Sequence, residues 1–243
     1  MFQQNNQGYL DISQQQVDSL SLSKTFLSNV FSWMFLGLLS TAGTAYIFSG
    51  NASLMALLVT ETGLSVLGWV VMLGPLGFVL LMSFGFQRLS SITMIVLFLV
   101  YSVLMGMSLS FIFLAYSLGS VVSTFAITAG MFGTMALLGY TTKTDLTKFG
   151  SVMIMGVVGI VIASVVNLLI FKSSAFDYLI SLLGVLIFTG LTAYDVQKLK
   201  RIGSGIEIEG ESTRKLVIMG ALTLYLDFIN LFLFLLRFLG NRR

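Results

Sequence analysis

The sequence contains seven stretches of predominantly apolar residues, each long enough to cross a lipid bilayer. A helix needs about 20 such residues to span the hydrocarbon core. Hydrophobic residues make up 56% of the chain and charged residues 9%, with a mean hydropathy of +0.97, whereas soluble domains are about a quarter charged. The pattern predicts an all-α integral membrane protein. The expected spans are residues 28–47, 65–86, 91–114, 120–141, 151–171, 178–197 and 216–238.

The connections between these spans are mostly short, which predicts one compact seven-helix bundle. We expect a polar cytoplasmic N-terminal tail over residues 1–27, the seven-helix domain over residues 28–240 and a short basic tail over residues 241–243. The polar start lacks the basic segment, short apolar core and cleavage site of a signal peptide. The first helix is therefore expected to insert and to stay in the membrane.

Lysine and arginine are unevenly divided between the two ends of the predicted helices. If the N-terminus is cytoplasmic, nine of the 13 basic residues lie inside and four outside, which favours a cytoplasmic N-terminus and an outer C-terminus. The inner residues are Lys24, Arg88, Lys143, Lys148, Lys198, Lys200, Arg201, Arg214 and Lys215. The outer residues are Lys172, Arg237, Arg242 and Arg243.

Cysteine and histidine are both absent from the chain. Their absence excludes disulfides, zinc sites built on nitrogen or sulfur ligands, and nucleophilic mechanisms that depend on either residue. We expect no enzyme activity and no bound cofactor. Proton sensing near neutral pH would have to depend on carboxyl groups, because no imidazole is available to titrate.

Two acidic residues, Asp195 and Asp227, lie within the last two predicted spans. An acid near the middle of a span costs about 2.5 to 3.5 kcal/mol on insertion scales, and each Leu, Ile, Phe or Val offsets about 0.3 to 0.6 kcal/mol. The last span is apolar enough to insert despite Asp227. Tolerable insertion does not explain the acid, and acids inside membranes are usually functional.

Polar and small residues form one stripe on the last span and a shorter one on the sixth. The residues of each stripe are three or four positions apart, so they share a helix face. A polar stripe is expected to face the bundle interior, which predicts that the last helix is central. The stripe of the last span consists of Gly220, Thr223, Asp227 and Asn230. On the sixth span, Thr192 and Asp195 share a face with Phe188.

A single loop joins the sixth and seventh spans, so they are antiparallel and expected to bring Asp195 and Asp227 together. Two carboxylates in contact cannot both ionise easily, and one shared proton makes the pair titrate in two coupled steps. Such a pair is suited to act as a pH-sensitive latch. Doubly ionised, it would instead offer oxygen ligands to a divalent cation such as Ca²⁺. Arg88 is the basic residue expected to reach the pair from the second span.

A purely structural role for both acids stays open at this point. Each could make a polar contact or pair with Arg88 or with a lysine at the membrane edge. This alternative applies most to Asp195, which lies three residues before Lys198. Arg88 could equally be an ordinary anchor on the positive side of the membrane.

Three segments resemble the Bax inhibitor-1 family, also called the transmembrane Bax inhibitor motif family. They are "TFAITAGMFGTMALLGYTTKTDLTKFG", "AYDVQKLK" and "LTLYLDFINLFLFLLRFLG". The resemblance covers residues 26–240, and the short N-terminus and "GNRR" ending are similar to bacterial members, which implies the bacterial inner membrane.

This resemblance implies a seven-helix bundle with the last helix enclosed by six others, and a pH-sensitive Ca²⁺ leak across the membrane. It also implies that Asp195 and Asp227 take the positions of a paired aspartate sensor. The family's second-span arginine, which bridges to that pair, matches Arg88 to within one residue. The transported ion would be Ca²⁺.

Two other functions compete with a leak channel. An intramembrane aspartyl protease also carries acids on two neighbouring helices, but "LYLD" lacks the Gly-x-Gly-Asp context, and Pro75 as the only proline excludes a Pro-Ala-Leu motif. A modulator of a membrane quality-control protease is a role that the resemblance implies for some bacterial members, with the polar N-terminal tail as a handle. We expect the lipid bilayer as the main surroundings and no nucleic-acid partner.

Overall fold

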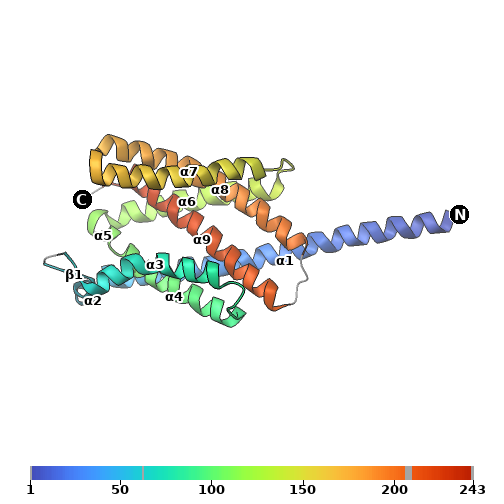
Figure 1. Cartoon of the computed structure of the whole chain (residues 1–243), viewed down its shortest axis with the longest axis horizontal. Helices are drawn as coiled ribbons and strands as arrows, with labels where there is room; N and C mark the ends of the chain where they lie inside the picture. The colour runs from blue at the N-terminus through green and yellow to red at the C-terminus, as the bar shows by residue number, and fades with distance from the viewer. Residues whose placement is uncertain (1, 62, 206–209, 242–243) are drawn as a thin grey trace.

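The computed structural model describes residues 2–61, 63–205 and 210–241, with side chains from residue 21 onward. These residues form a bundle of long helices, with one small two-stranded hairpin at the end of the bundle remote from the N-terminus (Figure 1). The elements are α1 (Phe2–Ser49), α2 (Ala52–Leu58), β1 (Val59–Thr60), β2 (Gly63–Leu64), α3 (Val66–Gly85), α4 (Ser91–Leu109), α5 (Ile112–Ala115), α6 (Leu118–Thr141), α7 (Thr147–Val166), the π-helical turn η1 (Asn167–Phe171), α8 (Ser174–Ser204) and α9 (Glu211–Leu239).

The seven predicted spans are confirmed among the described residues. Each expected apolar stretch lies within one helical segment that is long and apolar enough to cross a membrane, apart from one residue at either end of the second. The helical segments extend past most of the predicted boundaries by a few residues, because polar residues at the membrane edge continue the helix. They cover residues 21–49, 66–85, 91–115, 118–141, 147–171, 174–204 and 211–239.

Serine residues begin four of the spanning helices. The hydroxyl oxygens of Ser65, Ser90, Ser117 and Ser173 each accept a hydrogen bond from the backbone N–H three residues later. Such caps satisfy one of the backbone donors that have no partner within the first helical turn. Each of these four helices therefore begins at a capping serine that directly follows a connection between spans.

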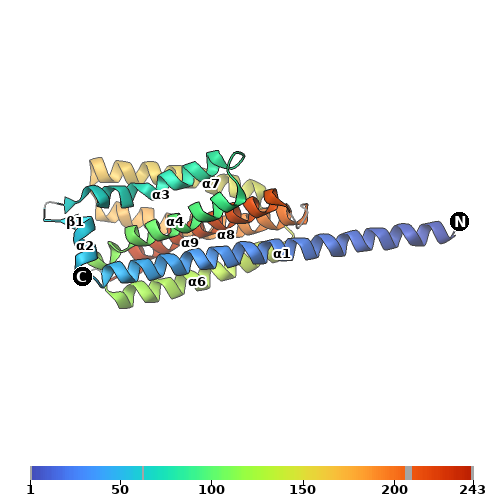
Figure 2. The ribbon, with the colours of Figure 1, turned by 90° about the horizontal axis from the view of Figure 1, so that it is seen from below.

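The polar N-terminal segment does not form a separate element. α1 runs without a break from Phe2 to Ser49, so the boundary expected after residue 27 falls inside a helix. The segment holds one glycine and no proline, and nothing in it forces the helix to begin later. The N-terminal part of α1 projects well beyond the other helices (Figures 1 and 2).

The last helix is central, as predicted. α9 packs against α1, α4, α6 and α8, and it is the most buried of the seven spans. Its fully buried side chains include Ile218, Leu224, Tyr225 and Leu231. In Figure 2, α9 runs through the middle of the bundle, with α1 alongside. A polar group on α9 is therefore enclosed by protein rather than by lipid.

Candidate functional site

The contact between α8 and α9 brings Asp195 and Asp227 together. The two helices are antiparallel neighbours that pack along much of their length. Asp227 is 5% exposed, Asp195 is half-buried, and their carboxyl groups lie within hydrogen-bonding reach of each other. A hydrogen bond between two carboxyl groups needs one proton, because two carboxylates offer only acceptors.

Apart from the contact with Asp195, one oxygen of Asp227 lacks a donor. Its Oδ2 atom is buried and accepts no hydrogen bond from an N–H or hydroxyl group of the residues that the structure describes. Buried polar atoms without a partner are uncommon in folded proteins and call for an explanation. The buried oxygen therefore depends on the Asp195 carboxyl group for a proton, which suits a pair that exchanges a proton.

Lys198 is a cation that acts on Asp195. It lies one helical turn after Asp195 on α8, and its ammonium group interacts electrostatically with the Asp195 carboxyl group. Lys198 is exposed at the end of the bundle and lies 6.0 Å from the centre of the Tyr194 ring. The Asp195 side of the pair is therefore close to an exposed lysine, while Asp227 is enclosed.

The expected bridge from Arg88 to the pair is not made. Arg88 is exposed in the turn between α3 and α4, and it makes no ion pair with any acid among the described residues. The reason is its position on the chain: α3 ends at Gly85 and packs against α2 and α4 rather than against the α8–α9 contact. The structure leaves Arg88 exposed in the turn after α3, and the anchoring alternative stays a prediction.

The three supporting polar residues also do not bond to the carboxyl groups. Thr192, Thr223 and Asn230 each donate a hydrogen bond to the backbone carbonyl four residues earlier in their own helix, at 2.8, 3.0 and 2.8 Å. Short polar side chains on helices commonly make this local bond, which removes the need for a partner on another helix. These three residues place polar atoms on the same helices as the aspartate pair but do not hold its carboxyl groups in position.

A second polar cluster that the sequence analysis missed lies on the opposite side of α9. The Tyr225 hydroxyl group is 2.7 Å from the Thr41 hydroxyl group, which donates a hydrogen bond to the carbonyl of Ser102. Tyr101 packs edge-on against Tyr225, and its buried hydroxyl has no partner among the described residues. This cluster ties α1, α4 and α9 together, and the Tyr225 position two residues before Asp227 was the only sequence signal for it.

A third cluster, also missed, holds the α6–α7 loop against α8. The amide group of Gln197 donates to the carbonyl of Thr144 and accepts from the backbone N–H of Leu146, at 2.7 and 2.9 Å. Arg201 forms an ion pair with Asp145 at 2.7 Å. Hydrogen bonds from Thr147, together with Arg201, lower the pKa of Asp145 to about 2.

The aspartate pair alone does not form a complete metal site. Groups of three or more Asp, Glu, His or Cys side chains able to hold a metal are absent among the described residues. Two carboxyl groups supply only about half of the six to eight oxygen ligands that Ca²⁺ takes. The donor set of the pair is therefore too small to hold a Ca²⁺ ion by itself.

Comparison with known proteins gives one consistent family. The sequence model of the family described as "Inhibitor of apoptosis-promoting Bax1" matches residues 23–243. The chain is 48% identical over 221 residues to the inner membrane protein YbhL of Escherichia coli (strain K12), covering 90% of this chain and 93% of the relative. It is 47% identical over 234 residues to a protein of Borreliella burgdorferi, covering 96% and 99% of the two chains. A membrane protein of Streptococcus pyogenes is 40% identical over 157 residues, 65% of this chain and 67% of the relative.

Proposed function

The chain belongs to the Bax inhibitor-1 family of multi-pass membrane proteins, and we propose that it is a pH-sensitive cation leak, with Ca²⁺ as the transported ion. The observation that carries the proposal is the contact between Asp195 and Asp227 on the central helix. This contact needs a proton to persist. A change in pH therefore changes the force between α8 and α9.

The proposed gate is the α8–α9 contact itself. With one proton shared, the carboxyl groups attract each other; with both ionised, two like charges repel across the same contact. Lys198 of α8 interacts electrostatically with Asp195, whereas Tyr225 of α9 and Tyr101 of α4 contact each other on the opposite side of α9. Because α9 is enclosed by four helices, its displacement would open a path through the bundle.

The proposed cation path uses the pair as a transient contact. Two carboxylates attract a divalent cation, but their incomplete ligand set would release it again. Rapid conduction requires binding that is weak enough to allow exit. We propose that the path runs between a cytoplasmic N-terminus and an outer C-terminus, the orientation that the distribution of Lys and Arg favours.

The decisive experiment measures Ca²⁺ flux into liposomes against pH. Asp227→Asn keeps the size and hydrogen-bonding capacity of the side chain but cannot ionise, so the pH dependence of flux should disappear while the folded yield persists. Asp177→Asn is the matched control, because it removes a carboxylate at the far end of α8, where Asn167 donates to it at 2.8 Å. An Asp227→Asn protein with the wild-type pH profile and a lower folded yield would make Asp227 a structural contact.

A second candidate function is the modulation of a membrane quality-control protease. The projection of α1 beyond the bundle favours it, because a free helical segment offers a partner a handle that does not disturb the spans (Figure 1). Deletion of residues 2–20 distinguishes the two functions. Ca²⁺ leak should survive the deletion, whereas an interaction that depends on the segment should not.

A further inference from the structure

The seam between α1 and α6 is hollow along most of the bundle. Both helices pack against α8 and α9, but three adjoining cavities of about 270, 460 and 490 Å³ separate their facing sides. Neighbouring cavities share lining residues, so together they form one groove. Leu38, Ala42 and Phe125 line both the first and the second cavity, and Phe31, Gly133 and Ala136 line both the second and the third.

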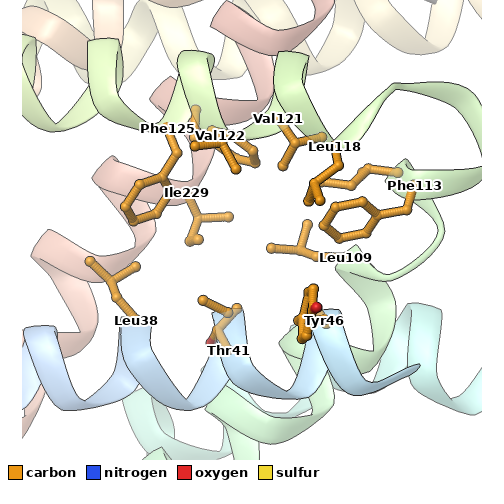
Figure 3. A pocket seen from close by; sticks show the side chains of 14 residues that line it. Leu38, Thr41, Tyr46, Leu109, Phe113, Leu118, Val121, Val122, Phe125 and Ile229 are labelled. Carbon is orange, nitrogen blue, oxygen red and sulfur yellow. The ribbon is translucent and has the colours of Figure 1, made fainter. Parts of the chain in front are cut away.

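The groove has almost exclusively apolar walls. Figure 3 shows its end near the short helix α5, where side chains of α1 and α6 face each other and Ile229 of α9 forms part of the floor. Thr41 is a rare polar residue there, and its hydroxyl is already bonded to Tyr225 and to the carbonyl of Ser102. An occupant of this groove must therefore be apolar over most of its length.

The opposite end of the groove is basic. The third cavity reaches Lys24 and Tyr140, and a fourth cavity of about 440 Å³ lies beside it, between α1, the α6–α7 loop and α8. Lys200 marks the junction: its Nζ atom donates to the carbonyl of Tyr140 at 2.7 Å and lies 4.6 Å from the centre of the Tyr140 ring. Lys143 also lines the fourth cavity.

Positive charge dominates this end. Arg201 is neutralised by its ion pair with Asp145. Lys24, Lys143 and Lys200 have no acidic partner among the residues that the structure describes. A basic pocket at the end of an apolar groove between membrane helices matches a molecule with one hydrocarbon chain and an anionic head.

We propose that the α1–α6 groove binds an anionic phospholipid of the surrounding membrane, with its phosphate at Lys143 and Lys200 and an acyl chain along α6. A chain of one leaflet spans about half of the 30 Å hydrocarbon core, so it occupies the third and second cavities. Gly133 lines both of these cavities. The proposal is independent of the aspartate pair and of the ion leak.

The head-group arm of the test uses native mass spectrometry on the full chain in detergent, titrated with phosphatidylglycerol, phosphatidylcholine or inorganic phosphate. The wild type should retain phosphatidylglycerol and discriminate against the other two. Each lysine near an anionic surface changes binding about fivefold, so Lys143→Ala with Lys200→Ala should lower affinity for phosphatidylglycerol about 25-fold. Lys148→Ala is the control, since it removes the same charge from the first turn of α7, where the residue does not line the fourth cavity. An equal loss with Lys148→Ala would overturn the site in favour of diffuse attraction.

The groove arm uses two glycines with open space around an added Cβ atom. Gly133→Phe fills the groove, and Gly159→Phe adds the same side chain to α7, which does not line any of the four cavities. Retention of phosphatidylglycerol should be lost with Gly133→Phe and unchanged with Gly159→Phe. Unchanged retention of phosphatidylglycerol in both variants would overturn the proposal. A dimer mass that only Gly133→Phe abolishes would also overturn it, because the occupant of the groove would then be another copy of the chain.

Discussion

α7 and α9 are both long apolar helices, yet they occupy opposite environments. In the most apolar part of each span, 67% of the residues of α9 are buried, against 11% for the span that contains α7. The span of α7 is the more hydrophobic of the two. Hydrophobicity therefore decides which segments enter the membrane, but not which of them lies at the centre.

The polar and small residues, rather than hydrophobicity, indicate which helix lies at the centre of the bundle. Lipid solvates an apolar side chain as well as a protein interior does, so burial of leucine gives little driving force between helices in a membrane. At the middle of a span, a carboxyl group or a tyrosine hydroxyl is poorly solvated by lipid and is more stable facing protein. α9 carries Asp227 and Tyr225 at its middle, whereas α7 carries no charged residue between Lys148 and Val166.

The largest difference between buried and lipid-facing positions should appear at close helix contacts. A Cβ atom added at Gly139 of α6 would collide with the backbone carbonyl of Ala193 in α8, whereas one added at Gly159 of α7 meets nothing within 4 Å. Gly139→Ala should destabilise the fold by about 3 kcal/mol, the upper range for overpacking, because a helix backbone must move. Gly159→Ala should be neutral. Thermal unfolding in detergent would measure both, and equal midpoints would contradict the α6–α8 contact.

A smaller difference is expected when the same side chain is truncated on α9 and on α7. Ile218 of α9 is 1% exposed, and Ile162 of α7 is 58% exposed. Ile218→Ala should lower the free energy of unfolding by about 2 kcal/mol, the low end of the range for core truncations. The substitution still leaves a cavity, but moving an apolar side chain from lipid into protein contributes less than moving it out of water. Ile162→Ala should stay within about 0.5 kcal/mol. Reversible unfolding measurements that show equal costs would mean that α9 is not the central helix under membrane-like conditions.

The spans, the central position of α9 and the approach of Asp195 to Asp227 were all predictable from the sequence. All three follow from properties of single helices and one short loop: length, polar periodicity and antiparallel connection. The position of Arg88 was not predictable in this way. A basic residue just past a helix end can point into the bundle or away from it, and the helix that lies opposite decides which. α3, which ends just before Arg88, lies against α4 rather than α8.

The groove and the loop contacts were also beyond the sequence. The side of α6 that lines the groove and the side that faces lipid are equally apolar, so helical periodicity cannot separate them. Gln197 and Arg201 hold a loop whose backbone conformation fixes their partners. The partners of Thr192, Thr223 and Asn230 could not be foreseen either, because a bond within the helix competes with any bond between helices.

The smallest expected effect on stability concerns the contacts that hold α7 to the rest of the bundle. α9 is held by packing along its length, whereas the start of α7 is also held by polar contacts of the α6–α7 loop with α8, among them the ion pair of Asp145 with Arg201 at 2.7 Å. The folded state lowers the pKa of Asp145 from 3.8 to about 2, so this contribution to stability is complete above about pH 4 and is lost as the pH falls toward 2. Asp145 is fully exposed, and solvent screening keeps the effect small.

Asp145→Asn should therefore lower the unfolding midpoint slightly at neutral pH and flatten its decline between pH 4 and pH 2. Thermal unfolding against pH in a non-ionic detergent would measure this, with Glu61→Gln as the control that removes an exposed carboxylate without an ion pair among the described residues. If both variants follow the wild-type curve at every pH, the ion pair does not fasten α7. Its attachment would then rest on the packing of Gly150 against Tyr194 and of Gly156 against Ile187, contacts of the same kind that hold the central helix.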